Sequence, residues 1–147
     1  MFENVTTLLD KAIALNEDLA WLLSVDNGVK KEIIKFNTID QLRDKGIDSL
    51  NRSLGDYSQI SVEVFGKRDG HITLEDTGDF YHSFRVSVEK DGFTINANSI
   101  KHGAKGTVDL TTRFGDDIIG LTEENRDIIT ELIMKNIVKY VKKQLNV

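Results

Sequence analysis

The chain has 147 residues, of which 39% are hydrophobic and 29% charged, which is typical of a globular protein with a single core. Its net charge of −5 argues against binding along a nucleic-acid backbone or to an anionic membrane, because both require a clustered excess of lysine and arginine. No apolar run approaches the roughly 20 residues of a membrane span, and the lack of cysteine excludes disulfides, thiolate metal sites and cysteine nucleophiles.

The N-terminal segment, 1–36, is predicted to be helical. Apolar residues spaced i, i+3 and i+4 predict a first amphipathic helix, and a second apolar run, 19–23, either continues it or restarts after Asn16 as N-cap. Asp26-Asn27-Gly28 is predicted to end this helix, since Asn and Gly accept the left-handed conformation. Val29–Phe36 is predicted to form another short helix. The first apolar stripe consists of Val5, Leu8, Leu9, Ala12 and Ile13.

The next stretch is predicted to be mostly irregular. Thr38 with Gln41 three residues later is typical of a capping box that opens a brief helical turn through Leu42. From Lys45 to Ser58 turn-forming residues dominate and periodicity fades, so we predict an irregular loop with a turn of helix near Leu50–Leu54.

A β region is predicted over 59–98. Apolar residues alternate with polar ones over 60–64, which is the period of a half-buried strand, and Lys67–Gly70 follows as a turn. Asp76 or Thr77 can then cap a single helical turn over Asp79–Ser83. The alternating apolar residues are Ile60, Val62 and Val64.

The strongest local signal is a β-hairpin over Phe84–Asn98. Asp91-Gly92 favours a two-residue turn, and apolar residues alternate on both sides of it. On this interpretation Gly92 has a positive φ, so Gly92→Val should cost on the order of 1 kcal/mol or more. The alternating residues are Phe84, Val86 and Val88 before the turn, and Phe93, Ile95 and Ala97 after it.

A helical C-terminal segment, 107–145, is predicted to follow a polar loop over Asn98–Gly106. Its first helix is short, starts at Thr107 and ends at Gly115, with Leu110 and Phe114 directed inward.

The final helix has a predicted N-cap at Thr122 and an acidic first turn. Its lysines, 135, 139, 142 and 143, are interpreted as a solvated face that complements the helix dipole. The chain is therefore predicted to be a single α+β domain with N-terminal helices, a small antiparallel sheet with a hairpin, and a C-terminal amphipathic helix packed on the sheet. The buried stripe of that helix is Ile129, Leu132, Ile133, Ile137 and Tyr140.

The nearest approach to a metal site is Asp76, Asp79 and His82, spaced i, i+3 and i+6. Oxygen and imidazole ligands can hold a divalent cation, and on a helical turn the outer two would partly converge. The favoured alternative is that both carboxylates serve the start of a short helix and that the histidine is exposed. We therefore predict no metal and no cofactor.

Other polar groups do not assemble into a recognisable catalytic pattern. Asp116-Asp117 resembles a carboxylate pair but follows a glycine, as turn residues do. Gly103–Gly106 lacks the spacing of a phosphate loop and is predicted to be a flexible loop. His82 and Ser83 are neighbours, which point to opposite faces of a strand. No catalytic residue is predicted.

An aromatic cluster, Phe80, Tyr81 and Phe84, offers a different kind of site. Adjacent residues on a helical turn diverge by about 100°, so one ring is predicted to be exposed, and exposed rings commonly anchor interfaces. The alternative is that both rings are core. The candidate interface residues are Thr77, Gly78, Asp79, Phe80, Tyr81 and Phe84.

Two segments carry a wider resemblance: Leu74–Phe84, which reads LEDTGDFYHSF, and Leu110–Leu121, which reads LTTRFGDDIIGL. Together with Gln41-Leu42, Gly46–Asp48 and Gly55–Ser58, they make the chain similar to the virion-morphogenesis or tail-completion proteins of tailed bacteriophages.

The resemblance covers roughly Thr38 to Ile133 and has one departure. The family pattern has a longer lysine-rich stretch after Tyr57-Ser58, whereas here Gln59–Phe65 follows directly. The resemblance implies a non-enzymatic α+β subunit that forms a homo-oligomeric ring at the head–tail junction or tail top.

The leading functional hypothesis is therefore a structural virion protein, present in the host cytoplasm during assembly. Its expected partners are further copies of itself and other phage head–tail or tail proteins, with no membrane and no sequence-specific nucleic-acid binding. Two alternatives stay open: a small metal-dependent hydrolase that uses Asp76, Asp79 and His82, and a phage-encoded adaptor that binds a host protein as a monomer.

Overall fold

The computed structural model of the chain describes residues 21, 24–90 and 92–147. The predicted α+β class is confirmed, since helices combine with antiparallel strands and one long helix ends the chain. The strands form two separate two-stranded sheets, however, and not one small sheet. The predicted helix over Val5–Ile13 and its Asn16 alternative lie outside the described residues.

Helix α3 (Asn27–Lys35) runs directly into a π-helix (Phe36–Lys45). Asp26 caps α3, because its Oδ1 accepts a hydrogen bond from the Val29 backbone N–H at 2.9 Å. The predicted break is present, since Ser24 is helical and Val25 and Asp26 are not, but Asn27 and Gly28 begin α3 and do not adopt the left-handed conformation.

The predicted capping box at Thr38 and Gln41 is wrong, because both residues lie inside the π-helix. The Thr38 hydroxyl donates back to the Ile34 carbonyl at 2.7 Å, and Gln41 is completely buried. The helix ends at Gly46, whose φ of 62° provides the left-handed closing conformation.

The loop that follows is irregular over most of Lys45–Ser58, as predicted, but Leu50–Leu54 contains no helical turn. Isolated bridges join Ile47 to Ser53 and Asp56 to His71.

A helix, α4 (Gln59–Phe65), takes the place of the strand predicted over 60–64. Ser58 caps its start by accepting a hydrogen bond from the Ser61 N–H at 3.2 Å, and Gly66 ends it with a φ of 62°. The two caps decide the conformation, since alternation over so short a segment discriminates poorly between helix and strand. No residue of α4 is buried.

The predicted first hairpin is confirmed as β1 (Arg85–Glu89) paired antiparallel with β2 (Gly92–Asn96). Its turn differs from the prediction. Glu89 pairs with Gly92, so Gly92 is the first residue of β2 and not part of the turn.

This register reverses the expected effect of Gly92→Val. A Cβ on Gly92 would meet no atom within 4 Å, and a strand position suits valine. We expect urea denaturation to show a free energy of unfolding within about 0.5 kcal/mol of the parent chain.

Gly106 is a matched control, because it begins the second strand of its hairpin and pairs with Gly103, as Gly92 pairs with Glu89, but has a φ of 120°. Gly106→Val should cost about 1–2 kcal/mol. A larger loss for Gly92→Val than for Gly106→Val would show that the register of β1 and β2 is wrong.

A second hairpin lies where a polar loop was predicted over Asn98–Gly106. β3 (Ile100–Gly103) pairs antiparallel with β4 (Gly106–Asp109). This hairpin was not predicted because most of its residues are polar and exposed, so the apolar alternation that indicates a strand is absent. The β region therefore spans 85–109, not 59–98.

Two short helices connect the hairpins to the core. The predicted helical turn is confirmed as α5 (Asp79–His82). The second, α6 (Leu110–Phe114), begins at Leu110 and not at Thr107, because the Asp109 carboxylate caps it by accepting from the Thr111 N–H at 3.0 Å.

After a 3₁₀ turn (Asp116–Ile118), the chain ends in α7 (Glu123–Leu145). The predicted cap at Thr122 is confirmed, since its hydroxyl accepts a hydrogen bond from the Asn125 N–H at 3.3 Å. Of the predicted stripe, Ile129 and Ile133 are buried, and the remaining members are partly buried.

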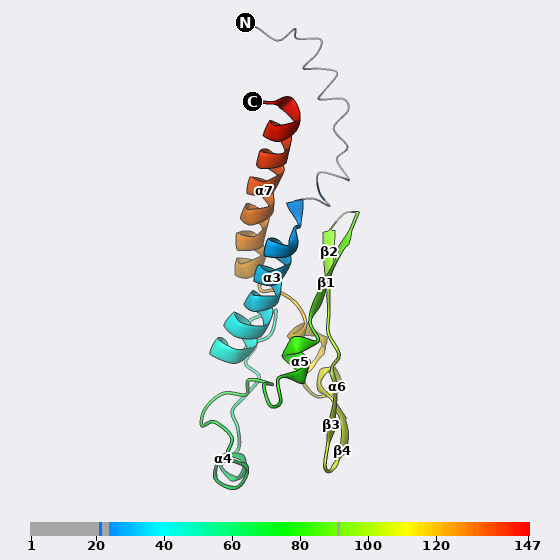
Figure 1. Cartoon of the computed structure of the whole chain (residues 1–147). Coiled ribbons are helices and arrows are strands. Elements are labelled where there is room, and N and C mark those ends of the chain that lie inside the picture. The colour runs from blue at the N-terminus through cyan, green and yellow to red at the C-terminus, as the bar shows by residue number, and fades with distance from the viewer. Residues whose placement is uncertain (1–20, 22–23, 91) are drawn as a thin grey trace, which may run out of the picture.

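Two hydrophobic clusters organise these elements. The first cluster joins α3, α7 and the β1–β2 hairpin. Within it, α7 packs chiefly on α3, and α3 packs on β1 (Figure 1). The prediction that α7 packs on the sheet is therefore wrong, because α3 is its main neighbour. The second joins the π-helix, α5, α6 and the 3₁₀ turn. Its buried members are Leu42, Phe80, Phe84, Leu110 and Ile118.

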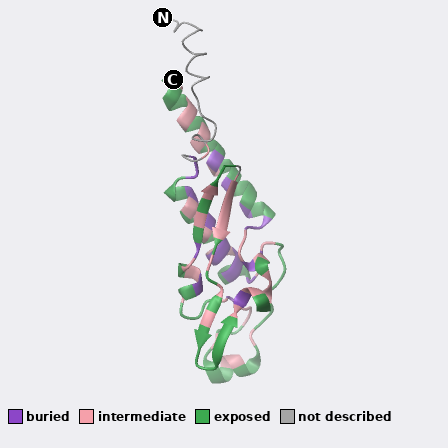
Figure 2. Ribbon diagram, turned by 90° about the vertical axis from the view of Figure 1, so that its right-hand side faces the viewer, coloured by how far each residue is buried: buried purple, intermediate pink, exposed green. Residues whose placement is uncertain are grey.

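The described part of the chain is elongated. In Figure 1, α7 rises to one end, while α4 and the β3–β4 hairpin form the other. Figure 2 shows the buried residues gathered in the middle and exposed residues covering most of β3, β4 and α4. Among the described residues no helix combines the length and apolarity that crossing a membrane requires.

Candidate functional site

The segment around α5 contains all the candidate interface residues. Gly78 stands before α5 with a φ of 86°, and Thr77 exchanges hydrogen bonds with Asp79. The Thr77 hydroxyl donates to Asp79 Oδ2 at 2.6 Å and accepts from the Asp79 N–H at 3.4 Å. Thr77 thus stabilises the start of α5, whereas the Asp76 carboxylate is engaged elsewhere.

The prediction that one ring of the aromatic cluster is exposed is wrong. Phe80 and Phe84 are buried, with ring centroids 5.0 Å apart in an edge-to-face arrangement. Tyr81 is half-buried, and its hydroxyl donates to the Thr73 carbonyl. The Tyr81 ring centroid lies 6.2 Å from that of Phe80, and burial raises the pKa of the Tyr81 phenol. Of the six candidate interface residues, Thr77 and Asp79 are therefore the exposed ones.

A glycine is required at position 78 by the helical turn of α5 that follows it. A Cβ at this position would lie 3.1 Å from Cε1 of His82, one turn later. Crowding by His82 and the positive φ together explain why a glycine stands here, without a second backbone close by.

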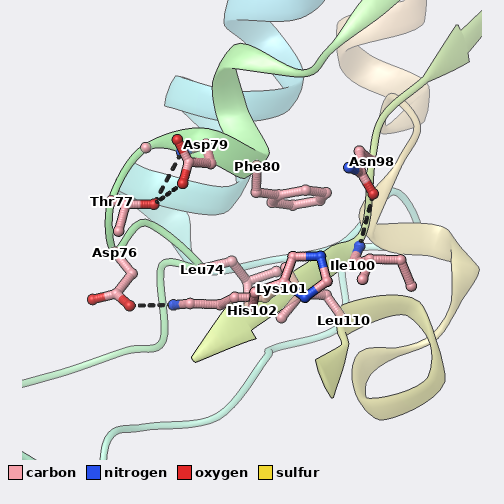
Figure 3. Close-up of a pocket in the computed structure, with 11 residues that line it drawn as sticks. Leu74, Asp76, Thr77, Asp79, Phe80, Asn98, Ile100, Lys101, His102 and Leu110 are labelled. Atoms are coloured by element: carbon pink, nitrogen blue, oxygen red, sulfur yellow. Dashed lines mark hydrogen bonds and ion pairs between the residues drawn. The ribbon is translucent and has the colours of Figure 1, made fainter. Parts of the chain in front are cut away.

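A cavity of about 280 Å³ lies between the α5 segment and β3. Figure 3 shows Asp76, Thr77 and Asp79 on one side of it and Ile100, Lys101 and His102 on the other, with Phe80 at its inner wall. The candidate residues Thr77 to Phe80 thus share one concave site with a strand that the sequence did not predict.

Asp76 joins three segments at the edge of this cavity. Its Oδ1 accepts from Lys67 Nζ at 2.6 Å, and its Oδ2 pairs with Lys101 (Figure 3). The hydrogen bonds from Lys101 and Lys67 lower the pKa of Asp76 to about 2. Both oxygens of the Asp76 carboxylate thus link the loop after α4 to β3.

The hypothetical metal set does not assemble. Both Asp76 oxygens contact lysines, and Asp79 is bonded to Thr77. Throughout residues 21, 24–90 and 92–147, no group of three His, Asp or Glu side chains is placed to hold a metal ion.

Asp76 should make the fold more sensitive to acid. Its folded pKa of about 2 lies below the ordinary 3.8, so its contribution to stability is present above about pH 4 and is lost as pH falls towards 2. Because the side chain is 42% exposed, we expect at most about 1 kcal/mol. Asp76→Asn should lower stability at pH 6 and flatten its decline between pH 4 and 2.

The measurement is urea denaturation at a series of pH values, with NMR titration of the Asp76 carboxyl. Lys101→Met should raise the Asp76 pKa, because Lys101 is the largest cause of its depression. An unchanged pKa in that variant would contradict the ion-pair geometry.

Sequence reasoning missed a buried set of amide side chains, here named the amide clamp: Asn37, Gln41 and Asn125. Asn37 donates to the Ile118 carbonyl and accepts from the Gly120 N–H, at 3.0 and 2.8 Å. Gln41 donates to the Gly120 carbonyl at 2.8 Å and accepts from the Thr122 N–H at 2.9 Å. The signal in the sequence was the i, i+4 spacing of the amides Asn37 and Gln41.

The other sequence candidates have structural partners. Asp117 binds Arg52 at 2.7 Å, and Arg52 also binds the buried Asp48, whose hydrogen bond raises the Arg52 pKa. Ser83 donates to the Phe80 carbonyl at 2.6 Å and accepts from the Asn98 N–H. Gly103–Gly106, the predicted flexible loop, is the turn of the β3–β4 hairpin.

A larger groove, of about 550 Å³, separates α4 and its flanking loops from the β3–β4 hairpin. Its floor includes Ile72, Leu74 and Phe114, and its rim carries Lys105 and Arg113. Beside it lies the α4–hairpin surface, a set of exposed apolar side chains: Ile60, Val64, Phe65, Ile100 and Val108.

Comparison of the chain with protein-family models, curated proteins and solved structures gave no match.

Proposed function

We propose that this chain is a non-enzymatic structural subunit of a tailed-phage virion. It assembles with further copies of itself into a ring at the head–tail junction or the tail top, where it contacts other head–tail or tail proteins. The phage assignment is supported by the resemblance of Leu74–Phe84 and Leu110–Leu121 to tail-completion proteins.

The observation that carries assembly is the α4–hairpin surface. Val64 and Phe65 are 68% and 61% exposed, although a seven-residue helix has little stability of its own in water. Several exposed apolar side chains at one end of a chain are typical of a surface that a neighbouring protein covers.

A ring also requires a second, different surface on the same subunit, because head-to-tail contacts join unlike faces. The side of α7 that faces away from α3 carries exposed Ile128, Met134 and Val138. Two unlike apolar surfaces on one elongated subunit support repetition around a ring.

The segments that resemble the phage family contribute to the frame behind these surfaces. Gly120 is held by the amide clamp, and Phe80 packs with Phe84 in the second cluster. On this proposal, the shared motifs preserve a scaffold that positions α4 and the hairpin for contact.

The decisive test is mass spectrometry of purified particles of the phage that encodes this chain. We expect the chain in stoichiometric amounts with other head–tail components, and its absence from infectious particles would reject the proposal. Light scattering during size exclusion adds the oligomeric state. A chain that is absent from particles, stays monomeric and binds a host protein would be the adaptor instead.

A further inference from the structure

The α4–hairpin groove has cations at its rim that lack carboxylate partners. Lys105 Nζ lies 5.6 Å from the centroid of the Phe65 ring, and the Arg113 guanidinium lies 5.2 Å from that of Phe114. In the described part of the chain neither cation forms an ion pair, unlike Lys67 and Lys101. The groove thus combines an apolar floor with two cations that have no carboxylate partner among the described residues, and its lining also includes the exposed carboxylate of Asp56.

The outer face of α7 has the opposite character. Helical spacing brings together six exposed residues, Glu124, Asp127, Ile128, Glu131, Met134 and Val138. Among the described residues none of the three carboxylates forms an ion pair, and Met134 is 52% exposed. This face therefore carries three apolar side chains and three available carboxylates, together with the exposed Lys135 one turn after Glu131.

One subunit cannot bring these two surfaces together. α7 is held on α3 by the first hydrophobic cluster, and its outer face points away from α3, whereas the groove lies at the far end beside α4 (Figure 1). The outer face of α7 can therefore reach only the groove of another molecule.

Resting on the proposed function, we infer that the groove between α4 and the β3–β4 hairpin receives the outer face of α7 from a second copy of this chain. The groove volume of about 550 Å³ suits two or three inserted side chains, as in helix-in-groove recognition. Met134 and Val138 enter the apolar floor, while Asp127 and Glu131, two turns earlier on the same side of α7, meet Lys105 and Arg113. The contact joins unlike surfaces, so it repeats head to tail.

Site-directed cross-linking tests the contact directly, because the chain has no cysteine of its own. Val108→Cys marks the groove and Met134→Cys marks α7. We expect oxidation of an equimolar mixture to give at least about tenfold more disulfide-linked dimer than either variant alone. A mixture of Val108→Cys with Lys31→Cys, an exposed position on α3, is the matched control and should give only the background.

Charge reversal provides an independent readout in solution. Lys105→Glu with Arg113→Glu reverses the groove, and Asp127→Lys with Glu131→Lys reverses α7. Each double variant should weaken self-association by at least about tenfold, and mixing the two should restore it, because opposite charges then meet again. Circular dichroism checks that each variant retains its helices.

The outcomes separate this inference from the proposed function. Dimers formed by Val108→Cys alone would mean that groove meets groove, which overturns the inference. An oligomeric parent chain with no specific cross-link would overturn the α7 contact and leave the ring intact. A parent chain that stays monomeric, gives no cross-link and is missing from particles would overturn both.

Discussion

Replacing Gln41 with leucine is expected to lower the free energy of unfolding by about 2–5 kcal/mol, because it leaves buried polar groups without partners. The Gln41 amide donates to the Gly120 carbonyl and accepts hydrogen bonds from the Thr122 N–H and from Asn125. Leucine has a similar volume but supplies none of these bonds. The measurement is the urea midpoint at constant slope.

A matched control is Gln144→Leu, since Gln144 is exposed near the end of α7. It should change the free energy of unfolding by no more than about 0.5 kcal/mol. Asn37→Leu should resemble Gln41→Leu, because Asn37 holds the Gly120 N–H and the Ile118 carbonyl. The double variant should cost less than the sum, since both residues hold Gly120. A Gln41→Leu variant as stable as the control would contradict the amide clamp.

Elements with local capping and turn signals could be predicted from the sequence. Thr122 caps α7 as expected, and the β1–β2 hairpin combines alternating strands with a turn-forming pair. The single turn of α5 was also predicted, and Thr77 stabilises its start. In each case neighbouring residues carry the information.

Elements that depend on distant contacts or on weak patterns were missed. Thr38 and Gln41 look like a capping box, but Gln41 is held inside a continuous helix by bonds to Gly120 and Thr122, about eighty positions away. The strand predicted over 60–64 is α4, because caps at Ser58 and Gly66 override the alternation. The β3–β4 hairpin lacks apolar alternation and gave no strand signal.

The interface at Thr77–Phe84 stays a prediction. Its residues Thr77 to Phe80 line a cavity, whereas the Phe80 and Phe84 rings are buried and Tyr81 is half-buried. The exposed apolar residues lie instead on α4, on the second hairpin and on α7. Sequence patterns could not assign them to a surface, because two of these elements were predicted with the wrong conformation.

Gly46→Ala should be among the most destabilising substitutions, at about 3–5 kcal/mol, because strain and a steric clash add. Gly46 closes the π-helix with a φ of 62°. An alanine Cβ would lie 2.4 Å from Cδ2 of His71 and 2.8 Å from its Cβ. Since even the His71 Cβ is too close, a change of rotamer cannot relieve the overlap, and His71 is further held by its contact with the Arg43 carbonyl.

Gly66 separates the two causes, because it has the same φ of 62° and no atom within 4 Å of an added Cβ. Gly66→Ala should therefore cost only the backbone strain, about 1–2 kcal/mol. In a His71→Gly background the cost of Gly46→Ala should fall to that same value, because the three nearest clashing atoms all belong to His71. If His71→Gly gave no such relief, the close packing of the Gly46 turn against His71 would be wrong. Relief to the Gly66 value would instead show that one histidine, and not the left-handed backbone alone, makes Gly46 irreplaceable.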